Sequence, residues 1–585
     1  MIKRELLVLA AWPLGALRVA LRRTLAFWSR NWLLTIQLSA MLILVGLIFR
    51  VAHWEPFSEG FLAIFLLLAL PSAALLLGTR RSLSISFAIG GILLLIEGAN
   101  KQKVELLKQN LHIFDALSLW AYLTEDKTIV ELYWKLAVNV IIVFGAFILV
   151  FIILRIIENR GFYSSRNIQG SRMLLICFGV AAIINVFIFA TGNYFWATSN
   201  EFIYSWVGRH GPPRFSDLFA SLVDVVRVEK ELSTRGIKSS AKAAKAPKGL
   251  ACSKCPNIIT VHVESVFDPA IVRDFDNSPP ITTFFSPRLI SSNGPLLTLV
   301  TGGWSVISEF SFNCGLDHRI FEISGLNPNF FLPRRINRCI PGYLRDQGYI
   351  TQIVSSAPYG VMRIGAAYSA YGVDIFSGPE TLSSRPLHWL EMRDGLFVDA
   401  AIKRLERPRT APRLLELLTT INHGPHGPYR PDQYPAKDFS GPYDLESAKS
   451  EELRDYVSRL NDSITAFRRL EEFIAASDVP TLIVYYGDHQ PSFKMDYSSG
   501  AVAHFGKDAI RHLTFYRIAR NFGKDSPAST DILPLDQLFG EALASAGIKL
   551  PPELLTKDRI ARECPNGILT CAEAKRRAMR ALILK

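Results

Sequence analysis

The chain has few cysteines and lacks the motifs of several common protein classes. Seven cysteines in 585 residues are too few for a disulfide scaffold. The CxxC pair Cys252 and Cys255 has no second CxxC, which argues against a structural zinc site. The cysteines after residue 200 are even in number: Cys252, Cys255, Cys314, Cys339, Cys564 and Cys571. In an oxidising compartment we therefore expect structural disulfides, with a pairing that the sequence leaves open.

The net charge of +13 has no nucleic-acid motif to accompany it. Many of the lysines and arginines stand beside long apolar runs instead, which is typical of membrane proteins. No small-residue cleavage site follows a short apolar core near the N-terminus, so we expect no cleavable signal peptide. The charge therefore indicates an anionic lipid surface and no nucleic-acid partner.

Long apolar runs are confined to the first 200 residues. A membrane-spanning helix needs about 20 predominantly apolar residues, and five segments meet this roughly: 32–50, 60–78, 81–98, 134–154 and 173–192. The basic segments before the first span, between the second and third, and after the fourth must all lie on one side, which the positive-inside rule makes cytoplasmic. Five spans then place the rest of the chain on the extracytoplasmic side of a bacterial inner membrane.

We therefore expect three parts: a helical membrane domain (1–198), a linker (199–256) and an extracytoplasmic domain (257–585). The lysine-rich tract 228–248 has little to bury and is typical of a solvated linker. The amphipathic segment 100–111 allows two interpretations. It is either a helix resting on the outer membrane face or a lid that presents a lipid head group.

After residue 257, short apolar runs alternate with helical patterns, which predicts an α/β fold. The best predicted strands are 258–263, 349–354, 414–420 and 481–486, and each ends in a polar cluster. In open α/β sheets, ligands bind beyond the carboxyl ends of the strands. The sequence therefore predicts a site at that edge, built from Glu264, Asn422-His423 and Asp488-His489.

Two carboxylates and one imidazole suit a divalent transition metal. Glu264, Asp488 and His489 offer a mixed oxygen and nitrogen set, which fits Zn²⁺ or Mn²⁺ better than calcium. One divalent ion held there would lower the pKa of a nearby hydroxyl. The segment 300–310 supplies candidates, because Gly302-Gly303 permit a tight turn and Ser305 begins a predicted helix.

These segments resemble the sulfatase (alkaline-phosphatase-like) superfamily, and within it the lipoteichoic acid synthase and phosphoglycerol transferase branch. Val-His-Val-Glu-Ser (261–265) resembles the strand that supplies a metal-binding glutamate. Gly-Trp-Ser-Val-Ile-Ser-Glu-Phe (303–310) resembles the nucleophile loop. Asn-His-Gly-Pro (422–425) resembles the substrate-binding histidine segment, and Tyr-Gly-Asp-His (486–489) the motif with two metal ligands. The resemblance implies an α-helical membrane domain of five transmembrane helices plus an alkaline-phosphatase-like α/β domain with a central, mostly parallel sheet.

The resemblance also implies a role for each site residue. Ser305 is the nucleophile and, with Glu264, Asp488 and His489, a metal ligand. Arg363 and His423 bind substrate. Thr301 and Ser308 are second choices for the nucleophile, and His426 is left open as a site or loop residue. We interpret His262 and His388 as structural, and Glu309 as ordering the helix start.

The implied reaction moves a phosphoglycerol group from phosphatidylglycerol to a glycan or polymer acceptor through a phospho-serine intermediate. Trp304 departs from the small, polar or basic residue usual in this branch, which leaves the exact head group open. An alternative is a phosphoethanolamine transferase acting on lipopolysaccharide. A tethered phosphatase or sulfatase is a further alternative, although the loop lacks the Cys/Ser-x-Pro-x-Arg sequence of sulfatases. A catalytically inactive binding module would lack a ligand, and none is missing from the sequence.

Overall fold

The computed structural model describes one α/β domain and a few isolated positions. The described residues are 255–562 (apart from 322, 334, 337–338, 385–386, 388–390, 430–437 and 524–531), with positions 88, 145, 148–153, 155–156, 578–579 and 582. Within these ranges no helix has the length and apolar character needed to cross a bilayer. The predicted spans, the segment 100–111, the tract 228–248 and His388 lie outside the described residues, apart from those isolated positions.

The described strands form one eight-stranded sheet with the order β4-β3-β5-β1-β6-β7-β2-β8. Strands β4, β3, β5, β1 and β6 run parallel, β7 is antiparallel to β6 and β2, and β8 is parallel to β2. The bounds are β1 Asn257–Val263, β2 Ile290–Leu297, β3 Ile350–Ser355, β4 Ile375–Ser377, β5 Arg413–Leu418, β6 Thr481–Gly487, β7 Leu513–Arg520 and β8 Leu533–Pro534. The prediction of a central, mostly parallel sheet is confirmed, and β1, β3, β5 and β6 match the four predicted strands.

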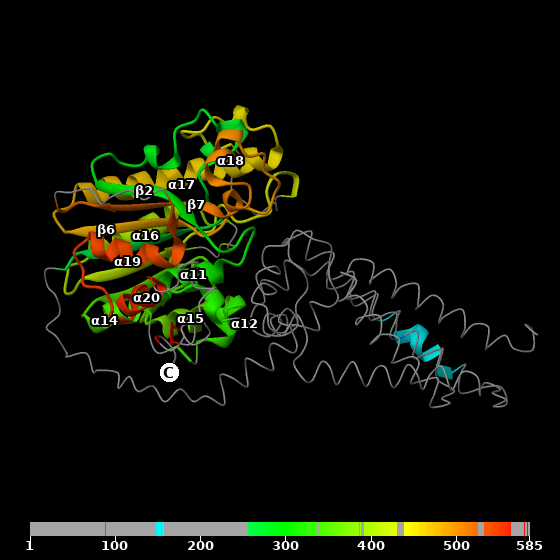
Figure 1. Cartoon of the computed structure of the whole chain (residues 1–585), viewed down its shortest axis with the longest axis horizontal. Helices are drawn as coiled ribbons and strands as arrows, with labels where there is room; N and C mark the ends of the chain where they lie inside the picture. Colours follow the sequence, from blue (N-terminus) through cyan, green and yellow to red (C-terminus); the bar gives the residue numbers. More distant parts are fainter. Residues whose placement is uncertain are drawn as a thin grey trace, which may run out of the picture.

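Helices cover both faces of the sheet (Figure 1). Helices α16 and α17 pack on one face, and α11, α14 and α19 on the other. The helix bounds are α11 Ser305–Cys314, α12 Ile323–Leu326, α13 Pro328–Phe331, α14 Ile340–Asp346, α15 Ile364–Tyr371, α16 Asp394–Leu405, α17 Glu451–Ala475, α18 Ser499–Phe505, α19 Leu535–Ser545 and α20 Pro552–Arg562. Because both faces are covered, the central strands are buried along their whole length, as in β1.

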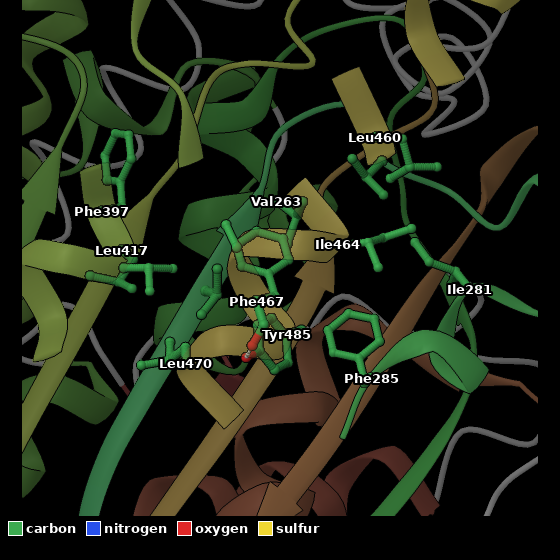
Figure 2. Packing of buried hydrophobic residues seen from close by; sticks show 14 of the residues in the cluster. Val263, Ile281, Phe285, Phe397, Leu417, Leu460, Ile464, Phe467, Leu470 and Tyr485 are labelled. Atoms are coloured by element: carbon green, nitrogen blue, oxygen red, sulfur yellow. Dashed lines mark hydrogen bonds between the residues drawn. The ribbon is translucent and has the colours of Figure 1, made fainter. Parts of the chain in front are cut away.

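The face under α16 and α17 is largely apolar, with one buried ion pair between Glu471 of α17 and Arg517 of β7. Figure 2 shows Val263, Phe285, Phe467 and Tyr485 in this layer, with Leu460 and Ile464 from α17 beside them. Helix α17 begins where the Ser450 hydroxyl accepts a hydrogen bond from the Leu453 amide, a standard helix N-cap. Burying a large apolar side chain contributes about 1.5–3 kcal/mol, so this layer holds the sheet in place.

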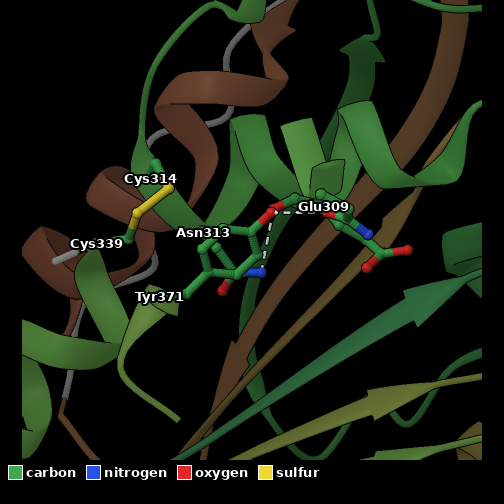
Figure 3. Close-up of a disulfide and its surroundings, with 6 residues drawn as sticks. Glu309, Asn313, Cys314, Cys339 and Tyr371 are labelled. Carbon is green, nitrogen blue, oxygen red and sulfur yellow. Dashed lines mark hydrogen bonds between the residues drawn. A yellow bond between two sulfur atoms is a disulfide. The ribbon is translucent and has the colours of Figure 1, made fainter. Parts of the chain in front are cut away.

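A disulfide joins the end of α11 to the residue before α14. Cys314 and Cys339 are bonded, as Figure 3 shows beside Glu309 and Asn313 of the same helix. Cys255 is disulfide-bonded as well. The expectation of structural disulfides is therefore confirmed for these cysteines.

Candidate metal and nucleophile site

The predicted site residues lie where parallel neighbouring strands end. Strand β1 pairs with β5 on one side and β6 on the other, so their carboxyl ends share an edge. Glu264 follows β1, Asp488 and His489 follow β6, and His423 lies five residues beyond the end of β5. The sheet topology thus brings together polar groups that are more than 200 positions apart in the sequence.

Ser305 reaches this edge from a strained turn. Gly302, Gly303 and Trp304 have φ values of 69°, 149° and 72°, and Ser305 is the first residue of α11. A non-glycine residue at positive φ is uncommon and clusters at functional sites. The Gly302 amide donates to the Gln490 carbonyl at 2.8 Å. That bond ties the turn to the segment that carries His489.

The Ser305 hydroxyl lies against the predicted ligands. Its Oγ donates to Glu264 Oε2 at 3.0 Å and lies 3.3 Å from His489 Nε2. His489 Nε2 in turn lies 3.5 Å from Glu264 Oε1 and 3.3 Å from Asp488 Oδ2. Because His489 Nδ1 lies 2.8 Å from the Gln490 carbonyl, which can only accept, Nδ1 carries a proton and Nε2 faces the cluster. The structure therefore brings all four predicted metal-site residues together.

The arrangement of these groups fits a divalent metal. Atoms that share a tetrahedral ion at bond lengths of about 2.1 Å lie about 3.4 Å apart, close to the distances above. Asp488 Oδ2 is fully buried and accepts no hydrogen bond of good geometry among the described residues. Glu264 is 5% exposed beside it. Two buried carboxylates with an unsatisfied oxygen favour a positive charge beside them, and a metal ion is one group that would supply it.

His262, which the sequence led us to interpret as structural, lies in this cluster. His262, Glu264 and Asp488 each offer a ligand atom within 4.8 Å of one another. His262 Nε2 lies 3.0 Å from Asp488 Oδ2, and its Nδ1 lies 3.9 Å from Glu309 Oε1. Burial alone would lower the pKa of His262, but Asp488, Glu309 and Glu264 together raise it to about 9. The alternation of His262 and Glu264 on one strand face was the sequence pattern that could have identified it.

Glu309 does not order the helix start as predicted. It is the fifth residue of α11, is 4% exposed, and faces His262. Burial raises the pKa of Glu309 to about 7 and that of the nearby Glu416 to about 8. Asp488 behaves in the opposite way. Burial works against its charge, yet His489 and His262 hold its pKa well below its ordinary value.

One buried guanidinium donates hydrogen bonds to the backbone of the loop that carries His423. Arg459, on α17, donates to the carbonyls of Ile421, His423 and Pro425 at 3.3, 2.9 and 3.2 Å. His423 is half-buried at the sheet edge. His426 is buried against the rings of Tyr456, on α17, and Phe493, and its Nε2 lies 3.1 Å from the Asn422 carbonyl. It therefore packs in the core beneath the loop.

Arg363 lies on a second strained turn next to the nucleophile turn. Met362 and Arg363 have φ values of 47° and 56°. Met362 and Trp304 both pack on the small cluster of Val300, Val306 and Ile307. The Arg363 guanidinium stands over the Phe330 ring at 5.5 Å. The described contacts thus place the Arg363 turn, rather than its guanidinium, against the nucleophile turn.

Comparisons with known proteins agree with this architecture. Residues 256–518 match the Sulfatase family model. A protein of Rhizobium meliloti (strain 1021), provisionally named a cyclic beta-1,2-glucan modification protein, is 22% identical over 256 residues, which cover 43% of this chain and 38% of that protein. An uncharacterized Haemophilus influenzae protein is 22% identical over 250 residues, covering 41% and 44%. The chain thus matches less than half the length of these curated relatives.

Among solved structures, the Streptococcus pyogenes phosphoglycerol transferase GacH in complex with sn-glycerol-1-phosphate is similar. It shares 14% identity at a TM-score of 0.40, with 61% of this chain and 91% of that chain covered. The residues that match the Sulfatase family model include most of the parallel sheet and the candidate metal site. The match therefore describes this domain and not the whole chain.

Proposed function

We propose that this protein is a membrane-anchored phosphoglycerol transferase that uses Ser305 as its nucleophile. One observation carries the proposal. The Ser305 hydroxyl is 3.0 Å from Glu264 and 3.3 Å from His489, at the start of a helix and on a strained turn. A surface serine has no reason to be held among metal-type ligands, whereas a nucleophilic serine does.

The reaction has two displacements at one phosphorus. Ser305 Oγ forms a bond to the phosphorus of phosphatidylglycerol, the bond to the diacylglycerol oxygen breaks, and that oxygen takes a proton. An acceptor hydroxyl then forms a bond to the same phosphorus, and Ser305 leaves as a hydroxyl again. A Mn²⁺ or Zn²⁺ ion bound by Glu264, Asp488, His489 and Ser305 would favour the ionised serine and neutralise phosphoryl charge. Arg363 would hold phosphoryl oxygens, and His423 would supply the proton.

The donor and acceptor follow from different arguments. Phosphatidylglycerol is favoured as donor because the nucleophile loop ends in Ser-Glu-Phe (308–310), as in the phosphoglycerol branch it resembles. The basic N-terminal region suits an anionic lipid. A glycan or polymer acceptor is favoured because the Rhizobium meliloti relative is named for glucan modification.

The proposed location is the extracytoplasmic side of the bacterial inner membrane, with five predicted spans in residues 1–198. Reporter fusions test this. A periplasm-dependent alkaline phosphatase should be active when fused after residue 585 and silent after Arg81. The reverse pattern would reject the five-span topology.

Covalent labelling tests the reaction. Wild-type protein incubated with phosphatidylglycerol labelled in its head group should carry a phosphoglyceryl adduct on the peptide that contains Ser305. An adduct on Thr301 or Ser308 would keep the mechanism and move the nucleophile. A phosphoethanolamine adduct, formed only from the ethanolamine lipid, would replace the proposal with a phosphoethanolamine transferase. Release of inorganic phosphate or sulfate without an adduct would favour a hydrolase.

A further inference from the structure

A column of buried polar residues runs from the nucleophile into the core. On β1, Thr260, His262 and Glu264 alternate and so share one face. On α11, Ser305, Glu309 and Asn313 are four residues apart and so share one stripe. We name these six residues the polar ladder. Figure 3 shows Glu309 and Asn313 on this helix, with Asn313 Nδ2 donating to the Glu309 carbonyl at 3.1 Å.

Residues of helix α11 and strand β1 face each other in pairs, which we call the rungs of the ladder. The top rung joins Ser305 to Glu264 at 3.0 Å. The next joins Glu309 to His262 at 3.9 Å. At the third, Asn313 lies near Glu416, which pairs with Thr260 across the sheet. The residues below the top rung are almost completely buried, at 3% for His262, 4% for Glu309, 0% for Asn313 and 2% for Thr260.

Such a column lowers the stability of the folded domain, because buried polar and charged groups lose their hydration. The same helix carries apolar residues such as Phe310 and Phe312 wherever it meets the hydrophobic core. The polar stripe therefore has a function that burial of apolar surface would not perform. Its position directly beneath the predicted ligands indicates support of the metal site.

His262 lies one rung below the ligands and touches one of them. Its Nε2 is 3.0 Å from Asp488 Oδ2 and 3.8 Å from Glu264 Oε2. The other oxygen of Asp488 already accepts the backbone amides of Ser265 and His489, at 2.7 and 2.9 Å. Among the described residues, Oδ2 of Asp488 accepts no backbone hydrogen bond, and His262 is placed to orient this oxygen.

We propose that His262 is a positioning residue for the metal ligand Asp488, and that Glu309 holds the His262 ring in that orientation. The inference rests on the proposed function only in requiring a divalent ion at Glu264, Asp488 and His489. Ligating carboxylates are commonly oriented by such outer partners, whose loss costs about 10- to 100-fold in metal affinity. Neither residue contacts the ion or the substrate.

Metal binding by the full chain tests the proposal without any lipid. Mn²⁺ affinity is measured by electron paramagnetic resonance, and electron spin-echo envelope modulation counts the imidazole nitrogens on bound Mn²⁺. His262→Gln should weaken binding by about 10- to 100-fold while the count stays at one imidazole, from His489. Glu309→Gln should weaken it less. The double variant should resemble His262→Gln, because Glu309 acts through His262.

Two matched controls keep the result specific. His318→Gln changes another buried histidine, which lies beyond the far end of α11. Asp394→Asn changes another buried carboxyl, at the start of α16 on the other face of the sheet. Both should leave the Mn²⁺ affinity within about twofold. Thermal unfolding of each metal-free variant confirms that it is folded.

Two outcomes would overturn the inference. A count of two imidazoles in the wild type, reduced to one in His262→Gln, would make His262 a ligand. Unchanged Mn²⁺ affinity in folded His262→Gln would make the ladder structural only. Neither outcome depends on transfer activity. Failure of the Ser305 adduct with the metal results intact would reject the transferase and keep the ladder.

Discussion

The two faces of strand β1 differ sharply in chemistry. Ile259, Val261 and Val263 face the apolar layer under α16 and α17. Thr260 and His262 face α11, and Glu264 continues that face beyond the strand end. All are buried to a similar degree. At the carboxyl end of β1, burial therefore serves two purposes: one side of the strand contributes stability, and the other holds polar groups in a fixed arrangement.

The difference between the two faces of β1 indicates which substitutions should change stability and which should change metal binding. Apolar contacts stabilise the fold in proportion to the area they bury. A polar cluster without its ion reduces stability, because its charges repel one another and lack water. Substitutions on the apolar face should therefore change unfolding and spare metal binding, and substitutions on the polar face should do the reverse.

The largest expected effect is on activity. Ser305→Ala should lower head-group transfer by at least about 10³-fold, because no covalent intermediate can form without the hydroxyl. Its melting temperature should stay close to that of the wild type. Transfer is measured as release of diacylglycerol from phosphatidylglycerol.

Ser311→Ala is the matched control for Ser305→Ala. Ser311 is a buried serine of the same helix, and its hydroxyl has no hydrogen-bond partner among the described residues. It should retain nearly full activity. Equal losses in both variants would mean that the helix, and not the nucleophile, had been damaged.

The second effect is on the apolar face. Phe467→Ala should lower the free energy of unfolding by about 3–5 kcal/mol, because Phe467 is 1% exposed and its removal leaves a cavity. Mn²⁺ affinity of the folded variant should be unchanged. Chemical denaturation and metal titration measure the two quantities. A parallel loss of metal affinity would show that the two faces are not independent.

The third effect is on the polar face. Glu264→Gln should remove most of the stabilisation that Mn²⁺ or Zn²⁺ gives the wild type, about 2.7 kcal/mol at a metal concentration of 100 times Kd. Without metal, the variant should be at least as stable as the wild type, because one of two neighbouring buried carboxylates is neutral. Thermal unfolding with and without a chelator checks this. An equal metal-induced shift in both proteins would remove Glu264 from the site.

Sequence patterns predicted the parts of this domain that depend on local order. The strand before Glu264 and the helix start at Ser305 follow from β-branched runs and a Gly-Gly turn. The roles of His262 and Glu309 did not follow, because each depends on which strand face meets which helix stripe. That register is set by tertiary packing. The left-handed Met362-Arg363 turn has no local signature either, since neither residue is glycine.

The smallest expected effect concerns a buried carboxyl on the α16 side of the sheet. Asp394, the first residue of α16, is completely buried, near the ion pair of Arg393 and Asp462. Burial raises its pKa from an ordinary 3.8 to about 7. Below pH 4 it is protonated in both the folded and the unfolded chain. Between pH 4 and 7 the unfolded chain releases its proton first, so the free energy of unfolding falls as pH rises.

Asp394→Asn removes this group's titration. The difference in unfolding free energy between variant and wild type should therefore rise with pH from about 4 to 7, by at most about 1.4 kcal/mol per pH unit, and stay constant above that range. Asp399→Asn is the control, because Asp399 lies on the same helix and its side chain is 62% exposed. Denaturation curves at a series of pH values measure the difference. A difference that does not change with pH would mean that Asp394 is already ionised in the folded domain at pH 4, and that the apolar side tolerates a buried charge as readily as the polar one.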